Sequence, residues 1–188
     1  MALVELSASE LAALLCSRVC HDVISPVGAI NNGLELLDDG GADEDAMDLI
    51  RTSAINASAR LQFARIAFGA AGSAGVQIDT GDAQAVAENY MNNEKSEFSW
   101  TGPRAYLAKS KVKLLLNLIL IANGSIPRGG TLEVELEVFG EDAKFTLTSR
   151  GRMLRVPQKF QDLLDGRTSE DPIDAHAVQY YYTLLLAG

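Results

Sequence analysis

The sequence predicts an α+β fold, in which an N-terminal helical hairpin precedes an α/β sandwich. Three observations support this prediction. Apolar residues recur at intervals of three and four along residues 12–37 and again along 47–68, which is the repeat of an amphipathic helix. Small residues fill positions 69–75, a composition typical of a linker. Residues 131–139 alternate apolar and acidic side chains, as in a strand with one buried face.

The first helix is predicted to begin after Ser7, because Ser7 and Glu10 have the spacing of a capping box. Pro26 removes one backbone donor within this helix, and we expect a bend there. The turn-forming residues 38–41 end the first helix, and the acidic residues 43–45 favour the start of a second. Two long helices with a short connection form an antiparallel hairpin. Because two helices cannot enclose a core of their own, we expect a homodimer that forms a four-helix bundle.

The pattern beyond the small-residue linker is mixed. The predicted strands are 76–80, 97–101, 131–139 and 144–148, and the predicted helices are 82–91, 109–122, 157–164 and 172–186. Gly140 and its neighbours provide the turn of a β-hairpin between the last two strands. We therefore expect two domains, a helical hairpin over residues 1–70 and an α/β domain over residues 76–188.

Composition restricts the classes of partner. The 188 residues are 47% hydrophobic and 22% charged, with a formal net charge of −9, which is the composition of a globular protein without a basic surface for nucleic acid or anionic lipid. The most apolar run, 114–122, is too short to span a bilayer, and the start of the chain lacks the pattern of a signal peptide. Cys16 and Cys20 are four residues apart, which suits free thiols in a reducing compartment better than a disulfide or a metal site. We therefore expect a cytoplasmic protein that binds no nucleic acid, membrane or metal.

His21 is the most prominent candidate for chemistry. It projects away from the apolar stripe of the first helix, so the sequence predicts an exposed imidazole on a rigid helix with Asp22 beside it. An ordinary solvated histidine fits the same pattern. His176 has no partner residue at a recognisable spacing, and we expect it to be structural.

Residues 18–30 resemble the H-box of the sensor histidine kinases. In that family a phosphorylated histidine is followed by an acidic residue, then by a small hydroxyl or amide residue and a proline; His21, Asp22, Ser25 and Pro26 take these places here. Residues 117–134 resemble the helix and strand of the kinase ATP-binding domain that carry the N-box. Ile121 stands where kinases have a magnesium-binding asparagine.

The kinase resemblance is incomplete in the nucleotide site. Residues 148–153 lack the acidic residue that reads adenine in kinases, and a glycine-rich lid is missing. A phosphotransfer hairpin joined to a degenerate ATPase-like domain resembles the bacterial histidine phosphotransferases. That resemblance implies a homodimer with no nucleotide cofactor, in which His21 accepts a phosphoryl group from the receiver domain of a hybrid histidine kinase and passes it to response regulators that control the cell cycle. The receiver would supply Mg²⁺.

The resemblance also implies roles for the neighbours of His21. Asp22 would orient the imidazole ring or remain a solvated acid, and Arg18 would assist the phosphoryl group or form a surface ion pair. The small residues beside His21 would let a receiver approach closely. The residues expected to flank the transfer are Ser17, Arg18 and Ser25, and those expected to bind the partner are Ile24, Gly28, Phe63 and Ile66. The apolar candidates Ile24, Phe63 and Ile66 have the alternative of packing against the second domain.

Two other functions fit the sequence. An atypical histidine kinase core would bind Mg-ATP and phosphorylate itself. A non-catalytic dimeric pseudokinase would bind partners without accepting phosphate. Whether the chain acts as an enzyme therefore stays open at the level of sequence.

Overall fold

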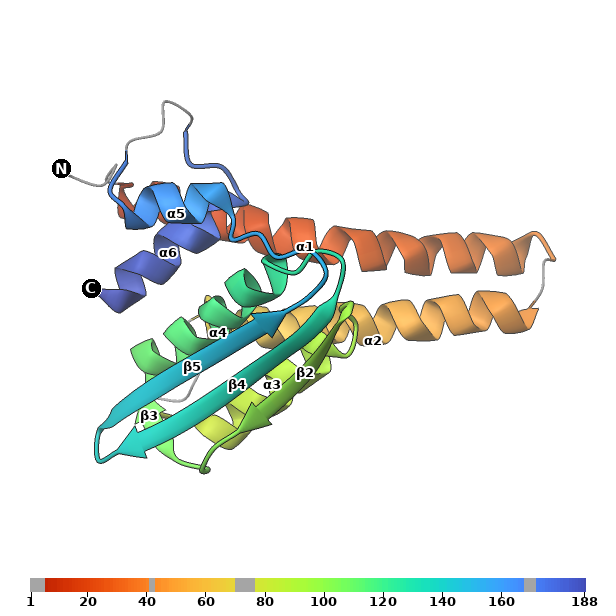
Figure 1. Cartoon of the computed structure of the whole chain (residues 1–188). Coiled ribbons are helices and arrows are strands. Elements are labelled where there is room, and N and C mark those ends of the chain that lie inside the picture. Colours follow the sequence, from red (N-terminus) through yellow and green to blue (C-terminus); the bar gives the residue numbers. More distant parts are fainter. Residues whose placement is uncertain (1–5, 41–42, 70–76, 168–171) are drawn as a thin grey trace.

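The computed structural model describes residues 6–40, 43–69, 77–167 and 172–188 (Figure 1). Two long helices, α1 (Ala8–Asp38) and α2 (Asp43–Ala67), form the hairpin, and residues 77–188 form what we call the α/β region. The elements of the α/β region are β1 (Gln77–Asp79), α3 (Thr80–Met91), β2 (Ser96–Thr101), β3 (Tyr106–Ala108), α4 (Lys109–Gly124), β4 (Gly130–Phe139), β5 (Asp142–Arg150), α5 (Gln158–Leu164) and α6 (Ala177–Ala187). The predicted α+β class and the helical hairpin are confirmed. The linker at 69–75 lies outside the described residues except for Gly69.

Local sequence signals fix the geometry of the hairpin. The capping box forms as predicted, since the Ser7 hydroxyl accepts from the Glu10 backbone N–H at 3.3 Å and the Glu10 carboxylate accepts from the Ser7 N–H at 2.9 Å. Gly33 lets the two helices approach closely, because a Cβ at this position would lie 2.6 Å from Cγ1 of Ile50. The helices therefore pack along their length.

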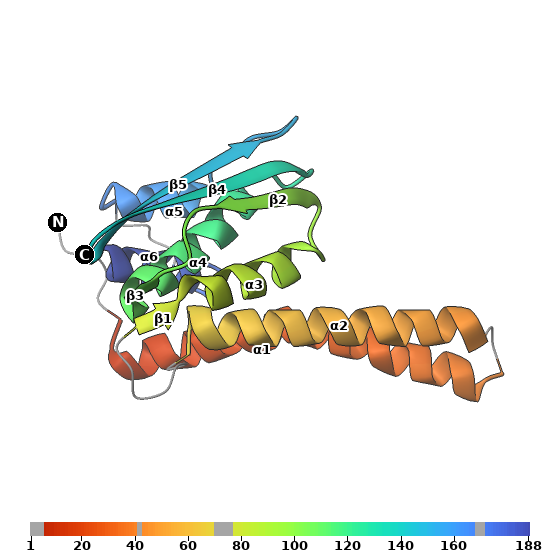
Figure 2. The ribbon, with the colours of Figure 1, turned by 90° about the horizontal axis from the view of Figure 1, so that it is seen from below.

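The molecule is built in layers (Figure 2). The hairpin lies beneath α3 and α4, and the sheet covers the other side of these helices. The sheet order is β2-β4-β5, with β2 parallel and β5 antiparallel to β4, while β1 and β3 form a separate antiparallel pair. The alternation predicted for β4 is confirmed, because Leu132, Val134 and Leu136 are buried.

One hydrophobic core joins the hairpin to the α/β region. Phe63 and Ile66 of α2 are only 1% and 7% exposed and belong to the same buried cluster as Leu115 and Leu116 of α4. The prediction that Phe63 and Ile66 face a partner protein is therefore wrong for this structure. Their face of α2 is turned toward α3 and α4, so they bind the two parts of the chain together and cannot meet an incoming surface.

One strand was missed in the sequence prediction, and most element boundaries differ from it by one or a few residues. The first strand is limited to β1, because the Asp79 carboxylate accepts from the Gly81 N–H at 2.8 Å and starts α3 at Thr80. The strand β3 was not predicted, since three residues are too few to show an alternating pattern. The last helix begins at Ala177 instead of residue 172. At its start the Asp174 carboxylate accepts from the Ala177 N–H at 2.7 Å.

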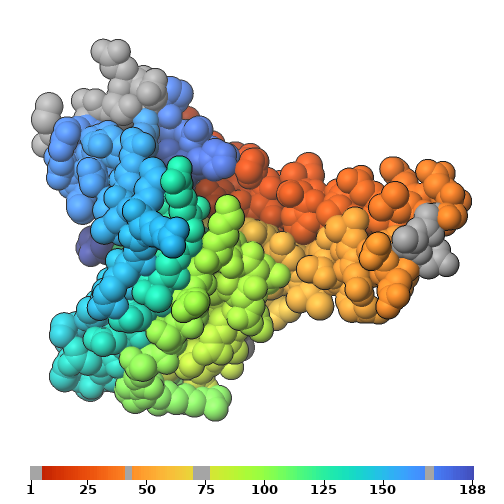
Figure 3. All heavy atoms as spheres, turned by 45° about the vertical axis from the view of Figure 1, so that its right-hand side comes forward, coloured from red at the N-terminus to blue at the C-terminus, as the bar shows by residue number. Residues whose placement is uncertain are grey.

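The hairpin extends beyond the α/β region (Figure 3), and apolar side chains of both its helices are exposed. Residues of the predicted apolar stripe that remain exposed in the single chain include Val27, Leu34, Met47 and Leu61. A shallow apolar groove of about 420 Å³ runs between the helices near their α/β end. Its lining residues are Leu15, Cys16, Val19, Leu61, Ala64, Arg65, Phe68 and Gly69. Within the described residues, α1 is also the one helix whose length and composition would allow it to cross a membrane, a property it shares with core helices of globular proteins.

Candidate functional site

His21 lies near the middle of α1, on the side that faces the start of α6. Its side chain is 60% exposed, whereas the side chains of Asp22 and Arg18 are 21% and 17% exposed. The prediction of an accessible imidazole on a rigid helix is thus confirmed. The two charged neighbours are more enclosed than the ring that they flank.

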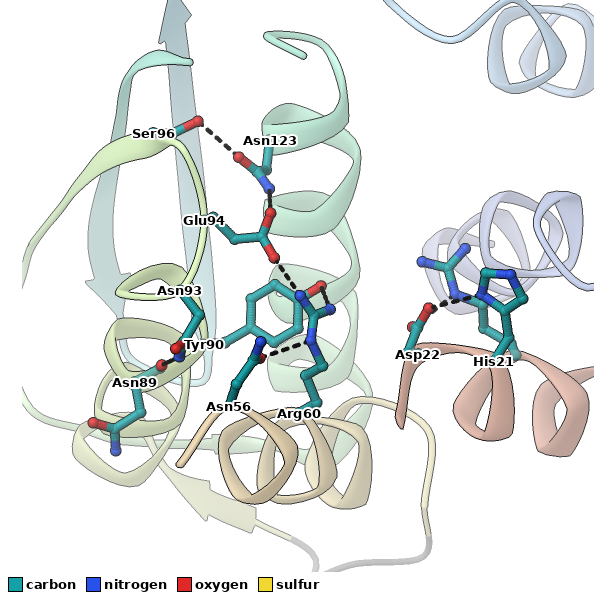
Figure 4. Close-up of polar contacts among 11 residues, drawn as sticks. His21, Asp22, Asn56, Arg60, Asn89, Tyr90, Asn93, Glu94, Ser96 and Asn123 are labelled. Atoms are coloured by element: carbon teal, nitrogen blue, oxygen red, sulfur yellow. Dashed lines mark hydrogen bonds and ion pairs between the residues drawn. The ribbon is translucent and has the colours of Figure 1, made fainter. Parts of the chain in front are cut away.

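The Asp22 carboxylate connects Arg18 to His21. Arg18 Nε donates to Asp22 Oδ2 at 2.8 Å, one helical turn away, and the other oxygen, Oδ1, lies 3.7 Å from His21 Nδ1 (Figure 4). The sequence analysis left two roles for Asp22, to orient the imidazole ring or to remain a solvated acid. Neither describes the structure fully, because the carboxylate is paired with Arg18 and lies slightly beyond hydrogen-bond distance of the ring. A carboxylate beside Nδ1 favours the tautomer with the proton on Nδ1, which leaves the lone pair on Nε2.

The predicted neighbours of His21 lie on the same face of α1 as the imidazole. Ser17 and Ser25 are exposed, and they lie one turn before and one turn after His21. Ile24 is 71% exposed on the same side, and a Cβ placed on Gly28 would meet no atom within 4 Å. The structure therefore places Ser17, Ile24 and Ser25 about one turn from His21 and Gly28 about two turns from it, all on the same face of α1.

His176 is a site residue that the sequence analysis missed. Its ring lies edge-on to the His21 ring, with centroids 4.7 Å apart and an interplanar angle of 79°. His176 is the last residue before α6, and α6 packs against α1. Sequence spacing could not reveal this contact, because the two histidines are brought together only when the α/β region docks on the hairpin.

The positions that correspond to the kinase nucleotide site have structural roles. Ile121 is buried in α4 and has no side-chain oxygen for a metal ion. Asn123, two residues later, donates to Glu94 Oε2 at 3.2 Å and accepts from Ser96 Oγ at 2.8 Å (Figure 4). Asn123, two residues after the position where kinases have the asparagine, thus joins α4 to the segment between α3 and β2 and to the first residue of β2.

This hydrogen-bonded chain continues into the hairpin. Arg60 of α2 donates to Glu94 Oε1 at 3.0 Å and to the Tyr90 hydroxyl at 3.2 Å, and its Nε donates to Asn56 at 2.8 Å. Burial raises the pKa of Tyr90 to about 12, with a further contribution from the negative charge of Glu94. We call this hydrogen-bonded set the Arg60 network; its members are Asn56, Arg60, Tyr90, Glu94, Ser96 and Asn123. It fixes the α/β region relative to α2.

Comparison with known proteins places the chain in a family. Residues 80–188 match the family described as the histidine phosphotransferase C-terminal domain. The chain is 71% identical over 184 residues to the protein phosphotransferase ChpT of Brucella abortus (strain 2308), a match that covers 98% of this chain and 88% of that protein. This chain belongs to the histidine phosphotransferase family.

The structure agrees with this assignment. A solved structure described as a bacterial phosphotransferase matches this histidine phosphotransferase with a TM-score of 0.94 and 68% identity, over 100% of this chain and 90% of that one. The resemblance predicted from the sequence is therefore confirmed. The family match lies within the α/β region and includes His176, and the match to the Brucella relative extends over the hairpin as well.

Proposed function

We propose that His21 is the phosphoryl acceptor and donor of this histidine phosphotransferase. The observation that carries the proposal is the exposed His21 ring, held on a rigid helix with the Asp22 carboxylate 3.7 Å from Nδ1. Imidazole is a nucleophile at neutral pH, and its phosphoramidate transfers readily. The small residues around the ring leave room for the loops of a receiver domain.

In the first step, the lone pair of His21 Nε2 attacks the phosphorus of a phosphorylated aspartate on a receiver domain. The N–P bond forms while the bond between phosphorus and the carboxylate oxygen breaks, and the electron pair leaves with the receiver carboxylate. The proton stays on Nδ1, where Asp22 stabilises the positive charge of the ring. Transfer to a second receiver reverses these events. The receivers would supply the Mg²⁺ that neutralises developing charge, so we expect no metal or nucleotide on this chain.

The relay partners follow from the same proposal. We expect the receiver domain of a hybrid histidine kinase as donor and response regulators that control the cell cycle as acceptors. Ile24 and Gly28 would contact the receiver, while Ser17 and Ser25 would flank the transferring group. Phe63 and Ile66 are not part of this surface, because they are buried.

Labelling by a receiver domain tests the proposal. A receiver carrying labelled phosphate should transfer an acid-labile label to the wild-type protein and none to His21→Ala. Incubation with labelled Mg-ATP alone should give no label, and autophosphorylation would instead support the histidine kinase function. Absence of label on the wild type in both experiments would leave the non-catalytic partner-binding function.

We further propose that two copies form a four-helix bundle through the exposed side of the hairpin. Leu61 lines the apolar groove and is 48% exposed in the single chain, and a second hairpin would cover it. Light scattering at micromolar concentration should give the mass of two chains, and Leu61→Glu should give one. Leu185→Glu is a matched control, because Leu185 is also 48% exposed but lies on α6. A wild-type monomer would overturn the proposal.

The proposed four-helix bundle also has a consequence for the location of the protein in the cell. Because a second hairpin would cover the apolar side of α1, we propose that this helix packs in a bundle and does not enter a lipid bilayer, and that the protein is cytoplasmic. Fractionation of cells into soluble and membrane fractions would test this, and recovery in the membrane fraction would contradict it.

A further inference from the structure

The rings of His21 and His176 are in contact although they come from opposite ends of the chain. Their centroids are 4.7 Å apart with an interplanar angle of 79°, so the edge of one ring meets the face of the other. His21 nevertheless keeps 60% of its side-chain surface exposed. The contact therefore restrains one side of the imidazole and leaves the rest accessible.

The backbone of His176 is held in place by Asp174. Asp174 Oδ1 accepts from the His176 N–H at 2.9 Å and from the Ala177 N–H at 2.7 Å. These hydrogen bonds, the one from Ala177 first, hold the pKa of Asp174 below its ordinary value, so the residue remains a carboxylate at neutral pH. Ala177 and Val178 are buried directly after His176. The backbone position of His176 is thus set by the first turn of a packed helix, from which its ring extends to His21.

The helix α6 is anchored both to the α/β core and to α1. Gln179 donates to the backbone oxygen of Asn117 in α4 at 2.9 Å, and the Tyr181 hydroxyl accepts from the Leu6 N–H just before α1 at 3.3 Å. Burial raises the pKa of Tyr180, and the nearby positive charge of Arg18 opposes this shift. The first turns of α6 therefore cover the part of α1 that carries Arg18 and His21.

We propose that His176 is a positioning residue for the phosphoryl acceptor: its ring holds the His21 imidazole in the orientation from which it attacks a receiver aspartyl phosphate. This inference rests on the phosphotransfer function proposed above. A histidine alone on a helix surface samples several rotamers, and ordering the nucleophile before the encounter removes that entropy from the barrier. Because His176 comes from the α/β region, a hairpin without that region would present a less ordered acceptor.

Transfer kinetics provide the first test. His176→Ala should slow labelling of His21 at saturating receiver by roughly threefold to tenfold, the range expected when one side chain is ordered during the reaction instead of beforehand. The receiver concentration at half-maximal rate should stay the same. His176→Phe, which keeps an aromatic ring at the contact, should restore most of the rate. Thermal unfolding of both variants should match the wild type, since His176 is itself exposed.

Nuclear magnetic resonance provides a direct readout of the contact between the two rings. The chain contains 2 histidines, so each imidazole signal can be assigned with one substitution. The ring protons of His21 and His176 should show a nuclear Overhauser effect, and His176→Ala should shift the His21 signals because a neighbouring ring current is lost.

Three results would overturn the proposal: no Overhauser effect between the two rings, an unchanged rate in His176→Ala, or a rate in His176→Phe as low as that in His176→Ala. A wild-type protein that accepts no label would overturn the phosphotransfer function and the role of His176 together. Full-rate labelling of His176→Ala would reject the role of His176 alone.

Discussion

The guanidinium of Arg60 on α2 lies 3.0 Å from the carboxylate of Glu94, beyond the end of α3. Both side chains are about four-fifths buried, and the other Glu94 oxygen accepts from Asn123 of α4. One ion pair thus ties the hairpin to the two helices that support the sheet. The same docking brings α6 and His176 to His21.

Removal of Arg60 should loosen this docking. Arg60→Met leaves the largely buried Glu94 carboxylate without its cationic partner and the Tyr90 hydroxyl without the donor from Arg60, and we expect the free energy of unfolding to fall by about 1–3 kcal/mol. Arg51→Met is the matched control, because Arg51 pairs with Asp48 on the exposed side of the same helix and should change stability by less than about 0.5 kcal/mol. Urea denaturation measures both, and equal effects would show that the Arg60 network does not join the two parts.

Tyr90 should make stability depend on alkaline pH. Its pKa is about 12 in the folded protein, raised mainly by burial, against about 10 in an unfolded chain. A raised pKa favours the protonated form in the fold, so this stabilisation is complete below about pH 10 and is lost as the pH rises toward 12. The difference of about two units between the folded and unfolded pKa values of Tyr90 corresponds to roughly 2–3 kcal/mol of folding free energy.

Denaturation from neutral pH to about pH 11 should therefore show a steeper loss of stability in the wild type than in Tyr90→Phe. The slope with pH is the quantity to compare, because Tyr90→Phe also loses the hydrogen bond from Arg60 at neutral pH. The slope with pH of Tyr180→Phe is a second one to compare with that of the wild type, since burial raises the pKa of Tyr180 as well. Identical slopes in the wild type and Tyr90→Phe would contradict the prediction.

Periodic features were predictable from the sequence, and contacts between distant elements were not. The capping box at Ser7, the two helices and the hairpin of β4 and β5 each follow from a local pattern whose physical cause acts within a few residues. The exposure of His21 followed in the same way. The burial of Phe63 did not, because a helix with apolar residues on more than one face does not reveal which face a partner covers.

The contact of His176 with His21 shows the same limit for the site. It depends on the docking of α6, which is determined by contacts such as that of Gln179 with Asn117 and has no signature in the neighbourhood of either histidine. The similarity to kinases at residues 117–134 did indicate where the magnesium-binding asparagine of kinases is missing, at Ile121. It could not indicate that Asn123 belongs to the Arg60 network.

Asp22 should contribute to phosphoryl transfer through its position beside His21 Nδ1. Asp22→Asn keeps the shape of the side chain but removes the charge that favours a proton on Nδ1, so we expect labelling of His21 by a phosphorylated receiver to slow by about tenfold or more. Asp45→Asn, an exposed acid in the first turn of α2, should leave the rate unchanged. An unchanged rate in Asp22→Asn would mean that its pairing with Arg18 is only structural.

The two glycines within α1 should respond in opposite ways to enlargement. Gly28→Ala adds a methyl group to open space and raises helix propensity, so we expect a gain of up to about 1 kcal/mol. Gly33→Ala places the methyl group 2.6 Å from Ile50, and we expect a loss of about 1–3 kcal/mol. Thermal or urea unfolding separates these effects, and a destabilised Gly28→Ala would show that its surface is already covered.

A larger side chain at the first of these glycines tests docking directly. Gly28→Leu should fold as well as Gly28→Ala, since no atom lies within 4 Å of the added Cβ. It should nevertheless obstruct a receiver that approaches His21 about two turns away on the same face of α1, and raise the receiver concentration at half-maximal labelling by about tenfold. The maximal rate should change less, because the imidazole and Asp22 keep their positions. Unaltered concentration dependence in Gly28→Leu would place the receiver on another side of His21.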